Sequence, residues 1–289
     1  MSATESTSLL DYYTSQSAIT DPGDYRTWFD DLPRDLAALM KLIQGLWLYT
    51  YEIPPEKHSD LLLRTIPKRL ERLFALDPAP LTTVRSPETR VYGLCRDYAV
   101  LLVAMLRHQG VPARERVGFC AYFDSAWYWD HRIAEYWQGA QQRWVLVDPH
   151  VQARPDKEHQ TQVDPLNITH ASRFLLAGEA WQLCRRGEAD PDLFVDSPTD
   201  RGMAMIRYAL LHDFDALNKV ELVGMDAWHE LIDKPEAQVT ETERQLLDEI
   251  ATLTVQPDAH FDQLRALYAT LPYSRQVQAR LQQALSTKI

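Results

Sequence analysis

Three residues far apart in the chain have the side-chain types of a thiol-based catalytic site. Cys95 stands at the start of a long apolar stretch, His131 follows 36 residues later, and Asp148 follows after a further 17. A cysteine nucleophile needs an ionised sulfur, a proton acceptor nearby, and a group that orients this acceptor. A thiol, an imidazole and a carboxylate in contact would support acyl transfer through a thioester.

The segment around Cys95 predicts a helix with the cysteine in its first turn. Residues 98–106 are apolar on almost every side, so we expect the helix to be buried. Gly110 and Pro112 would end it. The free N–H groups and the dipole at such a helix start favour a thiolate and can bind an oxyanion. A lone cysteine is more often an inert core residue, so the assignment depends on the histidine and the aspartate.

After this helix the spacing of apolar residues becomes that of strands. Alternation over 114–121 predicts one strand, and residues 131–138 and 143–148 predict two more that are joined by a hairpin turn. Antiparallel neighbours face each other, so such a hairpin can bring Asp148 beside His131. We therefore expect a buried helix followed by a short antiparallel sheet.

Helical spacing also appears on both sides of this core. The pattern predicts helices over 32–51, with Pro33 in the first turn, and over 59–75, with Ser59 as the N-cap. Residues 1–20 are polar, and we expect them to be frayed or loosely packed. Further predicted helices cover 171–186, 200–213, 215–223, 241–253, 259–270 and 274–286.

The composition is that of an ordinary globular protein with an acidic balance. The chain has 289 residues, 45% of them hydrophobic, and a formal net charge of −11. This charge disfavours binding to nucleic acid, and no apolar stretch reaches the roughly 20 residues that span a bilayer. The N-terminus lacks the pattern of a secretory signal, and three scattered cysteines favour free thiols in a reducing compartment. We therefore expect a cytoplasmic protein without nucleic-acid or membrane partners.

Three motifs follow one another in the central part of the chain. They read GLCRDYAVLLVAMLRHQGVPARERVGF, HRIAEYW and RWVLVDP. This arrangement resembles the transglutaminase-like superfamily, in which Gly-x-Cys opens a long helix, one strand carries a histidine, and the next ends in Asp-Pro. The resemblance implies a papain-like α+β fold, a helix packed on an antiparallel sheet. It also implies that Cys95 is the nucleophile, His131 the general base and acid, and Asp148 the residue that orients His131.

The flanking segments DPGDY, IQGL and RGMAMIRYALLHDFDALNKVEL resemble a group of stand-alone bacterial transglutaminase-like proteins. This resemblance implies that the helical ends belong to the same domain as the core. No linker rich in glycine, serine or proline divides the chain. We therefore expect one domain over 1–289, with a catalytic core at about 85–155 and helical flanks over 25–80 and 165–289.

Several other side chains are candidates for substrate contact. Trp129 is the best candidate for a cleft wall, although sheet packing is the commoner role of such a tryptophan. Arg96 stands where animal transglutaminases carry tryptophan, which puts their acyl-acceptor preference in doubt for this chain. Arg132 could bind an acidic substrate group, but we expect it to point to solvent. Arg201 and Arg207 would receive a substrate carboxylate or phosphate if their face points inward, although a solvated face is the commoner role.

The sequence contains none of the motifs that bind common cofactors. It lacks a phosphate loop, a dinucleotide fingerprint, metal-type histidine or cysteine spacing, and an EF-hand loop. We therefore predict that no cofactor, metal or calcium ion is required. Cys120 and Cys184 have no acid–base partner nearby in the sequence and are predicted to be structural, and His150 is expected to be a loop residue.

Two classes of function remain open. As an enzyme, the protein would attack an amide or acyl group of a small molecule or peptide through Cys95. An amine as second nucleophile would give a new amide, whereas water would make the protein an amidase or peptidase. As a binding or scaffold protein, it would have kept the fold without the chemistry, but the complete set of three residues favours the enzyme.

Overall fold

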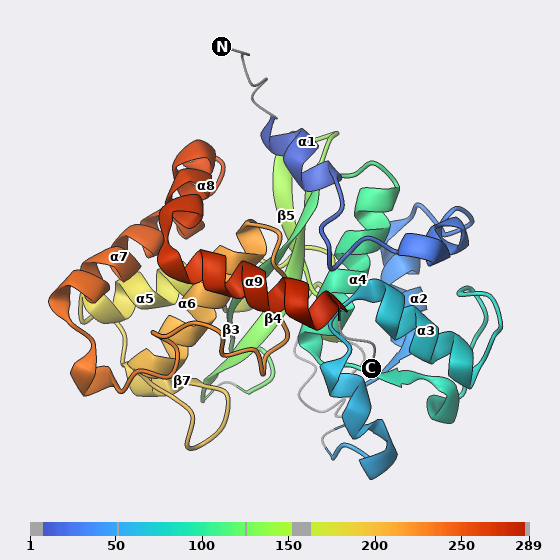
Figure 1. The fold of residues 1–289 in the computed structure, drawn as a ribbon, viewed down its shortest axis with the longest axis horizontal. Coiled ribbons are helices and arrows are strands. Elements are labelled where there is room, and N and C mark those ends of the chain that lie inside the picture. The colour runs from blue at the N-terminus through green and yellow to red at the C-terminus, as the bar shows by residue number, and fades with distance from the viewer. Residues whose placement is uncertain (1–7, 51, 125, 152–162, 287–289) are drawn as a thin grey trace.

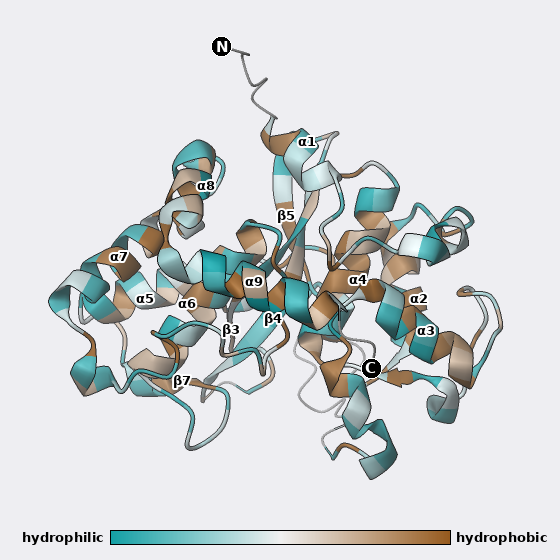
Figure 2. Cartoon of the chain, viewed as in Figure 1, coloured by the Kyte–Doolittle hydropathy of each residue, from teal (hydrophilic) through white to brown (hydrophobic). Residues whose placement is uncertain are grey.

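A buried helix packed against an antiparallel sheet forms the centre of the molecule (Figure 1). The computed structural model describes residues 8–50, 52–124, 126–151 and 163–286. The helix is α4 (Cys95–His108), and its residues from Arg96 to Arg107 are all buried. Figure 2 shows that α4 is largely hydrophobic, whereas α9 carries many hydrophilic residues. The predicted buried helix is therefore confirmed, because its apolar run leaves no face suited to solvent.

The sheet contains the predicted strands together with shorter ones. Its members are β3 (Ala113–Cys120), β4 (Tyr128–Gln138), β5 (Arg143–Val147), β6 (Phe174–Leu176) and β7 (Phe194–Val195). The order is β5-β4-β3-β6 with antiparallel neighbours, and β7 pairs with β4 in parallel. A separate parallel pair joins β1 (Trp47–Leu48) to β2 (Val91–Tyr92).

One edge of β4 changes its partner along the strand. β5 pairs with β4 from Ala134 onward, whereas β7 pairs with it at Tyr128 and Trp129. In the described part of the chain, no strand pairs with residues 130–133 on this edge, while β3 covers the opposite edge there. Because β4 begins earlier than predicted, His131 lies inside the strand and at this opening.

Helices cover both faces of the sheet. α4 packs against β3 and β4 on one face, and α6 (Met203–Leu217) packs against β3 on the other (Figure 1). α2 (Leu36–Leu46) and α3 (Ile66–Leu76) contact α4, whereas α5 (Ala177–Arg185) and α7 (Glu241–Val255) contact α6. Further helices are α1 (Leu9–Thr14), α8 (Phe261–Thr270) and α9 (Pro272–Ser286). Throughout residues 8–286 as described, the helices lack the combination of length and hydrophobicity that a bilayer span requires.

The helices before the core begin later than the sequence predicts, because other residues cap them. Asp35 caps α2 by accepting a hydrogen bond from the amide of Ala38, so Pro33 lies outside this helix. Thr65 caps α3, and Ser59 lies instead in a short 3-10 helix, Pro55–Leu62. A residue with a side-chain oxygen is a suitable cap at several positions, and only packing selects among them.

Two other predictions are also corrected. The predicted helices over 200–213 and 215–223 are one helix, α6, which ends at Leu217. The part of the first 20 residues that the structure describes is not frayed, since Tyr13 and Ile19 are buried in the core. Residues 1–7 lie outside the described residues.

The strand β6 occupies the first part of a segment that the sequence predicts as helix, and a glycine allows this. β6 pairs with β3 through Gly118, Phe119 and Cys120. A Cβ atom placed on Gly118 would lie 2.2 Å from the carbonyl oxygen of Leu175. Only glycine permits so close an approach of two backbones.

We expect the Gly118→Ala variant to lose about 1–3 kcal/mol of unfolding free energy, because the obstacle is a backbone atom. Urea unfolding measures this change. Gly45→Ala in α2 is the matched control, since nothing lies within 4 Å of its Cβ position. Alanine there should stabilise the helix by roughly 0.5–1 kcal/mol. Equal effects of the two substitutions would contradict this account of β6.

Candidate active site

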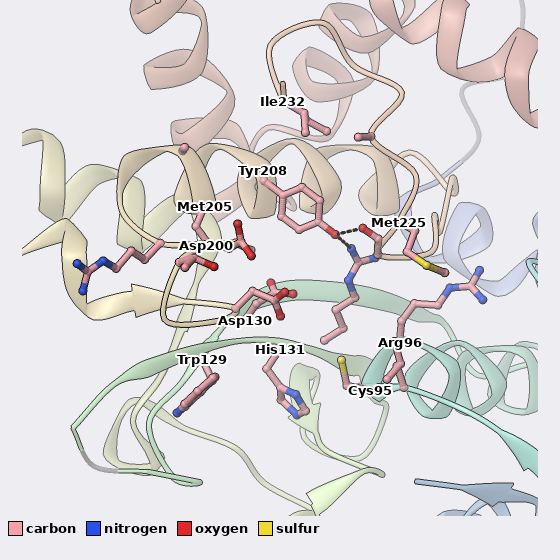
Figure 3. A pocket seen from close by; sticks show the side chains of 18 of the residues that line it. Cys95, Arg96, Trp129, Asp130, His131, Asp200, Met205, Tyr208, Met225 and Ile232 are labelled. Carbon is pink, nitrogen blue, oxygen red and sulfur yellow. Dashed lines mark hydrogen bonds between the residues drawn. The ribbon is translucent and has the colours of Figure 1, made fainter. Parts of the chain in front are cut away.

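The structure brings Cys95, His131 and Asp148 together from three different elements. Cys95 is the first residue of α4, His131 lies in β4, and Asp148 directly follows β5. The β4–β5 hairpin pairs Ala134 with Val147, so the chain beyond Val147 runs alongside His131. Figure 3 shows the sulfur of Cys95 next to the imidazole of His131. The predicted convergence of these side chains is thus present in the structure.

Asp148 holds the imidazole through a short hydrogen bond. Nε2 of His131 and Oδ2 of Asp148 are 2.8 Å apart, and both side chains are almost fully buried. The other oxygen, Oδ1, accepts hydrogen bonds from the amides of His150 at 2.9 Å and Val151 at 3.2 Å. Because Nε2 is bound by the carboxylate, Nδ1 is the ring nitrogen that remains for the sulfur.

Tyr122 is a functional candidate that the sequence analysis missed. Its hydroxyl donates a hydrogen bond of 2.6 Å to Oδ2 of Asp148. Burial, and then the charge of Asp148, raise the pKa of Tyr122 well above its usual value, so the hydroxyl keeps its proton. The residue belongs to no motif, and its place just beyond the end of β3 is the one signal that points to it.

The charges of His131 and Asp148 shift each other's pKa strongly. Burial alone would lower the pKa of His131, but the charge and hydrogen bond of Asp148, with help from Cys95, raise it to about 10. Burial alone would raise the pKa of Asp148, but His131 and the hydrogen bonds lower it to about 2. The pair is therefore an imidazolium and a carboxylate at neutral pH. An imidazolium beside a cysteine supplies the charge that a thiolate needs.

The start of α4 is fixed by an acidic residue of its own first turn. Asp97 accepts a hydrogen bond of 2.9 Å from the amide of Leu94 and forms a 2.7 Å ion pair with the buried Arg69. The amides of Cys95 and Arg96 have no acceptor within the helix, since α4 begins at Cys95. These two N–H groups are suited to bind the oxygen of a tetrahedral intermediate.

A cavity of about 920 Å³ opens over Cys95 and His131. Its apolar walls include Trp129, Met205, Met225 and Ile232 (Figure 3). Its acidic side chains are Asp124, Asp130, Asp196, Asp200 and Asp233. Burial raises the pKa of Asp130 to about 6; Arg132 opposes this shift and Asp196 adds to it. The cavity thus combines apolar walls with an excess of carboxylates.

The structure places two of the predicted substrate residues at this cavity. Trp129 lines it, is half-buried, and also packs against the hydrophobic cluster that contains Cys120 and Ile133, so it has the sheet-packing role as well. Arg201 also lines it and is exposed. Arg96 lines the cavity as well, but its guanidinium is buried and donates hydrogen bonds to protein atoms.

Two arginine predictions are corrected. Arg207 is fully buried, is not among the residues that line the cavity, and donates hydrogen bonds to the carbonyls of Leu231 and Lys234. It therefore stabilises a loop and is not placed to bind a substrate. Arg132 does not point to solvent: it is 2% exposed and lies at the floor of the cavity.

The remaining histidine and cysteine candidates have structural surroundings. His150 lies in the loop after β5, as predicted; it is buried, its ring packs edge-on against Tyr49, and it lines the cavity. Cys120 is fully buried in β3. Burial raises the pKa of Cys184 to about 11, which keeps this thiol protonated at neutral pH.

One group of side chains has a geometry that could hold a metal ion. His131, Asp148 and His150 each offer a ligand atom within 4.8 Å of the others. Both oxygens of Asp148 already accept hydrogen bonds, and one of these comes from His131 itself. The arrangement therefore suits the orientation of an imidazole better than metal coordination.

We expect Asp148→Asn to lower the pKa of His131 from about 10, because it removes the charge that raises this pKa most. An NMR titration of the His131 ring measures the change. The folded pKa of His131 lies above its unfolded value of 6.5, and that of Asp148 lies below its unfolded value of 3.8, so the pair's stabilisation is complete between pH 3.8 and 6.5. It is lost as the pH rises through about 10 or falls through about 2. A His131 ring that titrates near 6.5 in both proteins would contradict this assignment.

Comparison with known proteins agrees with the motifs. Residues 75–149 match the family model described as the transglutaminase-like superfamily. A crystal structure from Cytophaga hutchinsonii, described provisionally as a cysteine protease, is similar at 16% identity with a TM-score of 0.33. The similarity covers 48% of this chain and 41% of that protein. A search of curated proteins finds no match. The segment that matches the transglutaminase-like family model holds Cys95, His131 and Asp148, and the chain around it has an α+β fold with helices on both sides.

Proposed function

We propose that the protein is a thiol-dependent enzyme that transfers an acyl group through a thioester on Cys95. The observation that carries this proposal is the buried His131–Asp148 pair beside a half-buried cysteine at the start of a helix. The cavity above the sulfur gives a substrate access to it. We further propose that the helical flanks and the core form one domain, because one hydrophobic cluster joins them.

In the proposed reaction, the thiolate of Cys95 attacks the carbonyl carbon of an amide or activated acyl group. The amides of Cys95 and Arg96 bind the oxygen while it carries negative charge. The His131 imidazolium then gives its proton to the leaving amine, the carbon–nitrogen bond breaks, and a thioester remains. Neutral His131 next accepts a proton from the second nucleophile, which attacks the thioester and regenerates the thiolate.

An amine is the second nucleophile that the cavity suits best. The walls formed by Trp129, Met205, Met225 and Ile232 reduce the access of water to the thioester. Five aspartates line the cavity against three arginines. The carboxylates of Asp130, Asp196 and Asp200 therefore favour a cationic amine over an anion. Hydrolysis by water, as in an amidase or peptidase, is the alternative within the same mechanism.

A binding or scaffold role is the alternative from a different class. Such a role does not need a buried imidazolium beside a thiol, which is costly to keep unless its charge is used or compensated. The intact contact between His131 and Asp148 therefore supports the enzyme.

Alkylation by iodoacetamide tests whether Cys95 is the nucleophile. We expect Cys95 to react at pH 6–7 and His131→Gln to slow the reaction on the order of 10²-fold, the low end of a typical acid–base contribution. Peptide mass spectrometry identifies the modified cysteine. Cys120→Ala and Cys184→Ala are the controls and should leave the rate unchanged. Equal rates in the wild type and His131→Gln would show that the pair is not functional.

Incubation with cell extract tests the acyl transfer itself. The wild type should acquire an adduct on Cys95 whose mass identifies the acyl donor, and Cys95→Ala should acquire none. Addition of a primary amine should release the adduct faster than water does. Faster release by water than by the amine would favour the hydrolase.

A further inference from the structure

One wall of the cavity is a segment without regular secondary structure that joins α6 to α7. We call residues 218–235 the wall segment. Gly224, Met225, Ala227, Ile232 and Asp233 of this segment line the cavity. Backbone N–H groups bind six of its 18 carbonyls, so side chains from other elements also hold the segment in place.

Two arginines bind neighbouring carbonyls of the wall segment, and each directly follows a proposed catalytic residue. Arg96, next to Cys95, donates a hydrogen bond from Nη2 to the carbonyl of Glu221. Arg132, next to His131, donates from Nη1 to the carbonyl of Leu222 at 2.7 Å. Cys95 and His131 are therefore each followed by an arginine, and the two guanidinium groups bind consecutive carbonyls of the wall segment.

The guanidinium of Arg96 is fixed by further contacts at the start of α4. It is 3% exposed and donates from Nη1 to Asp97 at 3.1 Å and from Nη2 to the carbonyl of Arg64 at 2.8 Å. Asp97 is the residue that also binds the amide of Leu94. Arg96 thus connects the wall segment to Asp97, which fixes the first turn of α4.

The guanidinium of Arg132 is fixed in the same way on the other side. Its Nη2 donates to the hydroxyl of Tyr208 at 3.1 Å and to Nδ1 of His212 at 2.9 Å, both in α6. Glu115 of β3 lies 3.7 Å from Nη1. The hydroxyl of Tyr208, where Figure 3 draws two dashed lines, in turn donates to the carbonyl of Gly224. Arg132 therefore joins β4 to the wall segment both directly and through Tyr208.

The wall segment has an anchor that is independent of these arginines. The carboxylate of Glu221 accepts hydrogen bonds from Arg107 at 3.0 Å and from the hydroxyl of Ser17 at 2.8 Å. Arg107 lies in the last turn of α4, and both members of the ion pair are fully buried. Glu221 therefore binds α4 near both ends, through Arg96 and through Arg107. These contacts hold residues 221–222 in a fixed position relative to the helix.

We propose that Arg96 and Arg132 are positioning residues that fix Cys95 relative to His131. Through the consecutive carbonyls of Glu221 and Leu222, they hold the start of α4 and the strand β4 at one separation. The inference rests on the proposed function, because a fixed separation of sulfur and imidazole matters only if Cys95 and His131 act together in one reaction. A displacement of about 1 Å in such a site can cost on the order of 100-fold in rate.

Conservative substitution to lysine tests the proposal, since lysine keeps the charge but cannot bind several acceptors in a fixed plane. We expect Arg96→Lys and Arg132→Lys each to slow alkylation of Cys95 by iodoacetamide at pH 6–7 about tenfold or more, through this loss of alignment. The pKa of His131, measured by NMR, should fall because the contact with Cys95 contributes to raising it. Thermal unfolding checks that each variant is folded.

Arg207→Lys is the matched control. Arg207 is also fully buried and also binds carbonyls of the wall segment, but it is not adjacent to a proposed catalytic residue. We expect its alkylation rate and the pKa of His131 to match the wild type, whatever its melting temperature. Rates in Arg96→Lys and Arg132→Lys equal to the wild type, or an equal loss in Arg207→Lys, would overturn the proposal.

Glu221→Gln decides the question if the lysine variants do not fold. It leaves both arginines in place and weakens only the contacts of the carboxylate with Arg107 and Ser17, so a smaller loss in the same direction is expected. An unchanged rate in this variant would then overturn the proposal. The His131→Gln protein distinguishes failure of the proposed function from failure of the positioning role. If His131→Gln is alkylated as fast as the wild type, the proposed function is wrong. If His131→Gln is slower but the two arginine variants react like the wild type, only the positioning role is wrong.

Discussion

The contact between His131 and Asp148 is the interaction on which the rest of the site depends. Taking an ion pair out of water costs on the order of several kcal/mol per ion, so the pair is stable only if its other polar atoms are also bound. Tyr122 and the amides of His150 and Val151 supply those bonds to Asp148. These donors lie just beyond the ends of β3 and β5. The segments that leave these two strands therefore carry the hydrogen-bond donors that the carboxylate of Asp148 needs. The imidazolium that results lies beside the sulfur of Cys95.

The pairing of β4 also leaves His131 accessible to a substrate. A histidine in the middle of a sheet would normally have strands on both sides. Here the pairing of β5 with β4 stops at Ala134, and the pairing of β7 with β4 stops at Trp129. His131 lies between these two points, so β3 pairs with β4 on one edge there and the cavity lies near the other. The base can therefore be buried by its neighbours above and below while the reacting atoms stay reachable. Rigid strands that end at different points thus position the site more precisely than a loop would.

Much of this could be predicted from local sequence. The period of two over β3, β4 and β5 fixes the register of the hairpin, and that register carries Asp148 to His131. The apolar run of α4 fixes its burial. The remaining features depend on contacts between distant segments. β6 and β7 are too short to show a period, Thr65 and Ser59 are equally suitable caps by type, and Tyr122 has no motif. For Arg132 and Arg207 the sequence favours contact with solvent or substrate, because charged residues are seldom buried, yet their partners lie in the wall segment and in α6.

Buried arginines explain how the helical flanks contribute to the site without touching the reacting atoms. Arg107, Arg132 and Arg207 are each nearly inaccessible to solvent, and each binds a backbone carbonyl or a carboxylate from a distant part of the chain. A guanidinium presents five donors in one plane, so a single side chain can satisfy several carbonyls that no helix or strand uses. Apolar packing would bury such a segment but would leave its carbonyls unbound, at a cost of about 1–3 kcal/mol for each. The irregular wall of the cavity is therefore held by charge and hydrogen bonds rather than by hydrophobic contact alone, and the two flanks become part of the frame in which Cys95 meets His131.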